Sequence, residues 1–166
     1  RRAAVGRLSD AARLARVAER ETNEGVRDDA LRQLVDLALA RHKQTDESAS
    51  LVALAALTDQ KHIVGVARGS AFETVRSAAL ARLSDAKALG SVARQAEHET
   101  TRLDALARID DPAEILAVLL KTEFKDVALS ALERISDTEA LRLAAVRARN
   151  KVAARRARSR LRAIEA

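Results

Sequence analysis

A single apolar position recurs along this chain with a nearly fixed period of 26 residues. Leucine or isoleucine fills it at seven places, namely Leu8, Leu34, Leu57, Leu83, Ile109, Ile135 and Leu161. Only the step from Leu34 to Leu57 differs, because it spans 23 residues. An alanine lies four residues before each of the seven, and an aspartate lies two residues after the first six. Such a register is typical of stacked repeats in which each unit packs only on its neighbours.

Residues 73–97 show what one unit contains. Val75, Ala79 and Leu83 recur at every fourth residue, which is one stripe of an α-helix. Asp85 then interrupts the pattern as an expected N-cap, because its carboxylate can accept hydrogen bonds from the free N–H groups of a helix start. A second amphipathic stripe follows, formed by Leu89, Val92 and Ala93. We therefore predict an all-α, right-handed α-solenoid of about six to seven 26-residue helical hairpins, each with its short turn at the aspartate.

The unit that contains Ile109 repeats these helix-start signals. Asp111 is followed by Pro112, the only proline of the chain, at the expected first helical position. Glu114 stands three residues after Asp111, which predicts a capping box.

Composition excludes several classes of protein and site. The chain has no cysteine and only two aromatic residues, Phe72 and Phe124, so it contains no thiolate metal site and little material for an aromatic-lined ligand pocket. The three histidines lie in different units without the spacing of metal ligands: His42, His62 and His98. No apolar run approaches the roughly 20 residues that span a bilayer. We expect a cytoplasmic protein that is not an enzyme and uses no cofactor, metal or membrane.

The units resemble HEAT-like repeats, particularly short bacterial ones, through their Val-Arg openings at Val26-Arg27 and Val75-Arg76. The segments VRSAALARLSD and RRARSRLRAIEA further resemble the N-terminal arrays of large, functionally uncharacterised bacterial proteins that continue into coiled-coil-like domains. This resemblance implies a scaffold for protein–protein interaction and no enzymatic activity. Since the chain begins at Arg1 within the pattern, we expect residues 1–166 to be one repeat array from a longer protein.

Arginines and acids form the first candidate functional pattern. Five units carry an arginine at the same position: Arg7, Arg82, Arg108, Arg134 and Arg160. The first four have an aspartate three residues later, the last three of these being Asp85, Asp111 and Asp137. We predict a structural ladder of Arg–Asp pairs, with a row of free guanidinium groups for phosphate contacts as the alternative. Three Glu-x-x-Arg pairs predict helix-surface salt bridges: Glu24/Arg27, Glu73/Arg76 and Glu99/Arg102.

The second candidate is the basic C-terminal segment, a predicted helix within residues 150–166. Residues 1–139 hold 21 Lys and Arg against 23 acids, whereas residues 140–164 hold nine cations and no acid. Candidate contacts for phosphates or an acidic partner are Arg147, Arg149, Lys151, Arg155, Arg156, Arg158, Arg160 and Arg162. Two interpretations remain open, a soluble end cap of the array and an electrostatic surface for RNA, DNA or an acidic protein. Nucleic-acid binding is therefore the alternative function, and the oligomeric state stays open.

The third candidate lies in the short second unit. Leu51 and Val52 occupy positions that hold polar residues in several other units. One interpretation is tighter burial of an almost wholly apolar helix, and the other is an apolar patch for a protein partner. The preceding residues 43–48 are the most loop-like segment of the chain.

Overall fold

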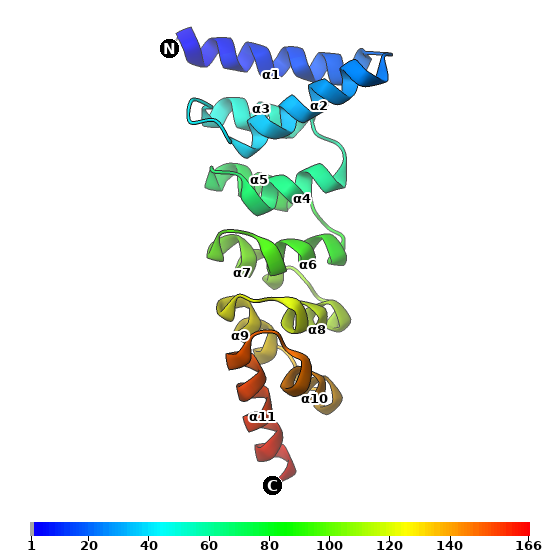
Figure 1. Cartoon of the computed structure of the whole chain (residues 1–166), viewed down its shortest axis with the longest axis vertical. Helices are drawn as coiled ribbons and strands as arrows, with labels where there is room; N and C mark the ends of the chain where they lie inside the picture. The colour runs from blue at the N-terminus through cyan, green and yellow to red at the C-terminus, as the bar shows by residue number, and fades with distance from the viewer. Residues whose placement is uncertain (1) are drawn as a thin grey trace. The chain divides into compact units, whose positions relative to one another are not determined.

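The computed structural model describes the backbone of residues 2–166 and the side chains of residues 10–166. Within that range all regular structure is helical, with 11 helices and no strands (Figure 1). The chain forms two compact units, Arg1–Leu83 and Ser84–Ala166. The first ladder arginine, Arg7, and the first periodic leucine, Leu8, lie outside the described side chains.

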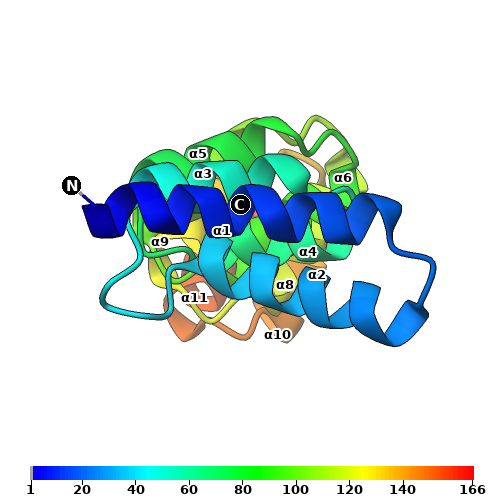
Figure 2. The same cartoon turned by 90° about the horizontal axis from the view of Figure 1, so that it is seen from above.

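The first unit contains five helices: α1 (Arg2–Arg20), α2 (Glu24–Leu39), α3 (Glu47–Ala56), α4 (Gln60–Gly69) and α5 (Glu73–Ala81). The helix α1 packs on both α2 and α3 (Figure 2). The predicted turns at Asp10 and Asp36 are wrong, because α1 and α2 run straight through these residues. The apolar stripe of α2 continues beyond Asp36, with Leu34 and Ala38 both fully buried, so packing extends the helix past the aspartate.

The connection between α2 and α3 runs from residue 40 to residue 46, close to the predicted loop at 43–48. The helix α2 ends at Ala40, which has a left-handed backbone with φ of 53°. The helix α3 then begins at Glu47, and the carboxylate of Asp46 accepts from the backbone N–H of Ala49 at 2.8 Å.

The second unit contains six helices: α6 (Ala86–Gln95), α7 (Glu99–Ala107), α8 (Pro112–Lys121), α9 (Lys125–Glu133), α10 (Thr138–Arg147) and α11 (Lys151–Glu165). The closely packed pairs are α6 with α7, α8 with α9 and α10 with α11. Each pair is joined by a three-residue connection at 96–98, 122–124 or 148–150, and not by the aspartate turn that the sequence predicted. Like helices then pack in succession, α6 on α8 and α7 on α9 on α11.

The predicted helix starts from Asp59 onwards are confirmed. Asp59, Asp85, Asp111 and Asp137 all lie at the N-cap, and each carboxylate accepts from a backbone N–H two or three residues later, at 2.8–3.0 Å. Pro112 follows Asp111 at the start of α8. The predicted inner stripes are buried in α4, α6, α8 and α10, as Ile63, Val66, Leu89, Val92, Val118, Leu119, Leu141 and Ala144 show.

Candidate functional site

Three arginines of the ladder, Arg82, Arg134 and Arg160, bind backbone carbonyls of another helix. The guanidinium of Arg134 donates to the carbonyl of Leu106 at 2.6 Å and to that of Ile109. Arg160 donates in the same way to Leu132 at 2.6 Å and Ile135 at 2.8 Å. These carbonyls end the preceding helix of the same kind, where acceptors lack intrahelical partners and a cation suits the helix dipole.

The same contact occurs in the first unit, where Arg82 donates to the carbonyls of Leu54, at 2.7 Å, and Leu57. We call this contact the carbonyl clamp. The aspartates Asp85 and Asp137 cap the following helices, so their carboxylates serve those helix starts. Arg108 stands at the end of α7, where Arg82 and Arg134 end α5 and α9. At Arg82, Arg134 and Arg160 the ladder therefore makes helix-end contacts between successive hairpins within each unit.

A second kind of arginine lies inside the protein and was not recognised from the sequence. Arg102 is only 7% exposed and donates to the carbonyls of Ala96 at 2.9 Å and Glu97 at 3.1 Å. Its guanidinium also donates to Asp126 at 2.8 Å and lies 3.8 Å from the centre of the Phe124 ring. Arg102 thus pairs with an acid in the next hairpin, whereas the sequence had paired it with Glu99.

Arg76 stands at the equivalent position in the first unit, 26 residues earlier. It is 6% exposed and donates to the carbonyls of Ser70 at 2.8 Å and Ala71 at 3.2 Å. Arg76 and Arg102 therefore each bind the loop ahead of their own helix, although Val75 precedes the first and Thr101 the second. In the sequence only their spacing of 26 residues could have indicated this shared role, because any residue can supply a backbone carbonyl.

A second ion pair joins α6 to α8. Arg94 donates to Glu114 at 3.0 Å, and the two side chains are only 20% and 12% exposed. Glu114 thus serves this contact, whereas the sequence had assigned it to a capping box. Gly90 makes room for it, because a Cβ on this glycine would lie 2.0 Å from Oε1 of Glu114.

Replacing Gly90 by alanine is expected to destabilise the chain by about 1–3 kcal/mol, because the new methyl group displaces the Glu114 carboxylate and leaves Arg94 without its buried partner. Gly65→Ala is the matched control. Gly65 also lies within a helix, and a Cβ there meets nothing within 4 Å. The control is expected to stabilise the chain by up to about 1 kcal/mol through helix propensity. Urea unfolding followed by circular dichroism measures both, and equal effects would contradict this role of Gly90.

The basic C-terminal segment forms α11, whose N-cap Asn150 accepts from the N–H groups of Val152 and Ala153, both at 3.1 Å. Arg160 is held in a carbonyl clamp, and Arg149 pairs with Glu123 at 3.2 Å on the surface. Arg158 donates through Nε to the carbonyl of Ala145 at 3.1 Å. The other predicted contacts are exposed and have no carboxylate partner among the described residues: Arg147, Lys151, Arg155, Arg156 and Arg162.

Arg142 adds an ion network beside these cations. It donates to Glu165 at 3.1 Å and to Glu139. The hydrogen bond that Arg142 donates to Glu165, together with the charge of Glu139, raises the pKa of Arg142 above its ordinary value. The one acid of α11 is therefore already engaged, and the free charge of this hairpin is positive.

Besides Val26 and Phe124, the exposed large apolar side chains of the described residues lie in two places. Leu51 on α3 is 37% exposed and Val52 is half-buried, while Ala49, Ala53 and Leu54 of the same helix are buried. The helix α3 therefore has one buried face and is not enclosed on all sides. The second group lies on the last hairpin, where Val146 is 84% exposed. This group was not identified from the sequence. Leu143, Val152 and Ile164 are also exposed there.

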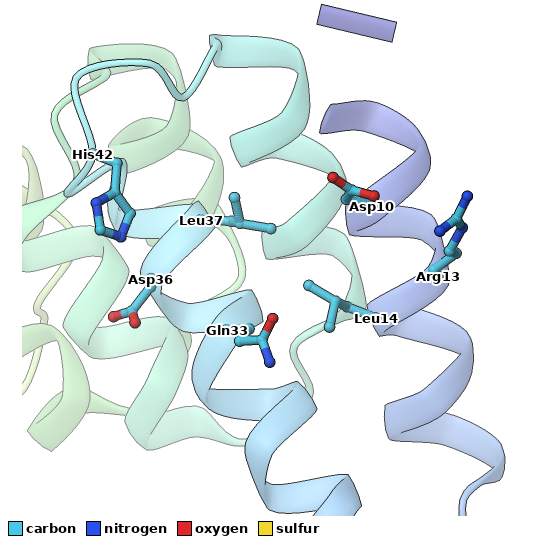
Figure 3. A pocket seen from close by; sticks show the side chains of 7 residues that line it. All are labelled: Asp10, Arg13, Leu14, Gln33, Asp36, Leu37 and His42. Atoms are coloured by element: carbon cyan, nitrogen blue, oxygen red, sulfur yellow. The ribbon is translucent and has the colours of Figure 1, made fainter. Parts of the chain in front are cut away.

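An open cavity of about 350 Å³ lies between α1 and α2. Figure 3 shows Leu14 and Leu37 between Asp10, on one side, and Asp36 with His42, on the other. Asp36 accepts from Arg41 at 3.4 Å. The two carboxylates are thus set apart by an apolar floor and do not form a pair for acid–base chemistry.

Metal and membrane signals are absent from the part of the chain that the structure describes. No group of three or more His, Asp or Glu side chains is arranged to hold a metal ion there. None of the described helices combines the length and the apolar character needed to cross a membrane.

Comparison with known proteins returned no relative: no protein-family model, no curated protein and no solved structure matches the chain.

Proposed function

We propose that this chain is a non-catalytic scaffold that binds a protein partner, built as a right-handed α-solenoid of about six to seven HEAT-like hairpins. The carbonyl clamp is the observation that carries this proposal. Each clamp fixes the end of one helix to the corresponding helix of the next hairpin, as Arg134 and Arg160 do in the second unit. Repeated contacts of this kind favour a preformed surface, and a preformed surface lowers the entropic cost of binding a partner.

The buried arginines support the same proposal. Arg76 and Arg102 donate hydrogen bonds to loop carbonyls, and Arg102 also binds Asp126. Guanidinium groups that are already bound and buried within the protein are not available to contact a polyanion. The phosphate-binding row that the sequence allowed is therefore not supported at Arg82, Arg134 and Arg160.

A second candidate function is nucleic-acid binding through phosphate contacts of the last hairpin. It is favoured by one observation, the five exposed cations without a carboxylate partner among the described residues. Such binding would be backbone-directed and strongly dependent on salt, because its driving force is the release of counterions.

A pair of selections on the immobilised chain tests the proposal. A random peptide library and a random pool of duplex DNA and RNA are enriched in parallel at near-physiological salt, ~0.15 M. We expect peptide families to enrich and to bind with Kd in the micromolar range or tighter, while nucleic acids wash off. Enrichment of nucleic acids without any peptide family would overturn the scaffold proposal in favour of the second candidate.

A further inference from the structure

The last helix differs from its counterparts in a way that changes the outer side of its hairpin. The helices α7 and α9 have nine residues each, but α11 has 15 and runs from Lys151 to Glu165. The aspartate that starts a new helix after Ile109 and Ile135 has no counterpart after Leu161, where Ala163 takes its place. Without that N-cap signal the helix simply continues.

This continuation removes the acceptors of the carbonyl clamp. In α9 the clamp uses the carbonyls of Leu132 and Ile135, near the helix end. The equivalent carbonyls in α11 belong to Arg158 and Leu161, which lie inside a continuous helix. Such carbonyls accept from the N–H four residues later. The carbonyls of α9 that accept in the clamp therefore have no free counterparts at the same positions of α11.

Two ion pairs with little exposure join the α6–α7 hairpin to the α8–α9 hairpin. Arg94 on α6 donates to Glu114 on α8, and Arg102 on α7 donates to Asp126 on α9. At the next interface the exposed pair runs the other way, from Arg149 of the later hairpin to Glu123 of the earlier one. The side of the α6–α7 hairpin that faces its successor thus offers guanidinium groups to carboxylates.

On α11 that side carries four cations in one stripe. Lys151, Arg155, Arg158 and Arg162 are spaced i, i+4, i+7 and i+11, so they share one helix face over about 16 Å. All four are exposed. Arg160 lies on the opposite face, from which it reaches back to the preceding hairpin. The stripe therefore faces away from the hairpin that is already packed.

An exposed valine extends this surface onto α10. Val146 is 84% exposed and stands 52 residues after Arg94, at the same position of the repeat. Arg94 uses this position to contact the next hairpin. The outer side of the last hairpin thus combines an apolar contact with a row of cations.

We propose that this surface, the end face formed by Val146, Lys151, Arg155, Arg158 and Arg162, docks an acidic amphipathic α-helix of a partner protein. Carboxylates at i, i+4, i+7 and i+11 of that helix lie opposite the four cations, and an apolar side chain covers Val146. The inference rests on the proposed scaffold function and names the partner of this one surface. Helix-borne carboxylates are what the chain itself places against the corresponding side of the α6–α7 hairpin.

A phosphate backbone fits the end face less well than a helix does. Phosphates would leave Val146 exposed, and none of the described residues of α10 and α11 is aromatic, so bases find no stacking platform. A helix axis at the usual packing distance of about 8–10 Å brings carboxylates and an apolar stripe to the surface together.

The experiment uses two labelled, end-blocked helical peptides of identical composition and charge. One carries Glu at i, i+4, i+7 and i+11 beside a leucine stripe, and the other has the same residues shuffled around the helix. Labelled duplex DNA is the third probe. Fluorescence anisotropy with the full chain at ~0.15 M salt is expected to show binding of the ordered peptide at least about tenfold tighter than binding of the shuffled one.

Two triple variants of equal charge provide the matched comparison. Lys151→Glu, Arg155→Glu and Arg162→Glu together alter the end face and leave the Arg158–Ala145 contact in place. Lys125→Glu, Arg147→Glu and Arg156→Glu together make the same charge change at exposed residues outside it. We expect the first triple to abolish the preference for the ordered peptide and the second to retain it. Circular dichroism melts of both variants establish that each is folded.

Three outcomes would overturn the inference. Equal binding of the two peptides would show that the end face attracts negative charge in general and does not recognise carboxylates arranged along one helix face. Duplex DNA that binds more tightly than either peptide, and is lost in both triples, would show a polyanion site and would also count against the scaffold function. Absence of binding by all three probes would remove the end face as a site, while the scaffold function would still be decided by the peptide selection.

Discussion

Replacing Asp126 by alanine is expected to destabilise the chain by about 3–5 kcal/mol, because it leaves the buried guanidinium of Arg102 without its carboxylate. The side chains of Arg102 and Asp126 are only 9% and 18% exposed, so water does not take over the lost contact. The remaining bonds of Arg102 to the carbonyls of Ala96 and Glu97 do not neutralise its charge. Chemical unfolding followed by circular dichroism measures the change, since the chain has no Trp or Tyr to report by fluorescence.

The chain contains its own control for this experiment. One repeat later, the positions of Arg102 and Asp126 are occupied by Ala128 and Val152. The double variant Arg102→Ala with Asp126→Val copies that arrangement and removes both charges. We expect it to cost less than Asp126→Ala alone, because no unpaired charge is buried. If the losses in unfolding free energy of the two single variants simply add, so that the double variant is the least stable, the result contradicts the pairing of Arg102 with Asp126.

Replacing Leu132 by arginine is expected to cost more than about 4 kcal/mol and to unfold much of the second unit, because a charge would be placed in a fully enclosed site. Leu132 is 0% exposed. Its counterpart one repeat later is Arg158, which is exposed. Arginine is therefore tolerated at position 158, whereas we expect it to be excluded from the equivalent position 132, one repeat earlier.

The reverse change, Arg158→Leu, is the matched control and is expected to alter stability by less than about 1 kcal/mol. It exchanges one hydrogen bond, from Arg158 to the carbonyl of Ala145, for some added apolar contact. Thermal melts and urea titrations of both variants measure the difference. A strongly stabilising Arg158→Leu would mean that position 158 is enclosed, which would remove the basis for placing it on the end face.

Local signals in the sequence predicted the helices of the regular units well. The caps at Asp59, Asp85, Asp111 and Asp137 and the start of α8 at Pro112 depend on residues within one helical turn, so they can be read directly. The same signal failed at Asp10 and Asp36. At Asp36 the apolar stripe of Leu34 and Ala38 continues on both sides of the aspartate, and its burial outweighs a single capping contact.

The predicted partners of the arginines depended on contacts that the sequence does not display. The carbonyl clamps join residues 25 and 28 positions apart, and Arg102 reaches Asp126 across 24 positions. Helix-surface pairing at i, i+3 was the nearest candidate in the sequence, yet it offers only about 0.2–0.5 kcal/mol per pair. Free carbonyls at a helix end and a buried carboxylate are stronger partners for a guanidinium, but both become available only after the hairpins have packed.

Local patterns were sufficient to predict the helical class, the helix starts at four aspartate caps and the positive charge of the last hairpin, because each follows from periodicity, composition or a contact within one turn. Only the tertiary structure shows which helices pair closely, which arginines bind carbonyls or carboxylates of another hairpin, and which arginines are exposed. Those properties follow from distances between residues far apart in the chain. A guanidinium has the same chemistry at Arg134, which donates to the end of another helix, and at Arg155, which is exposed, and only the packed surroundings distinguish the two.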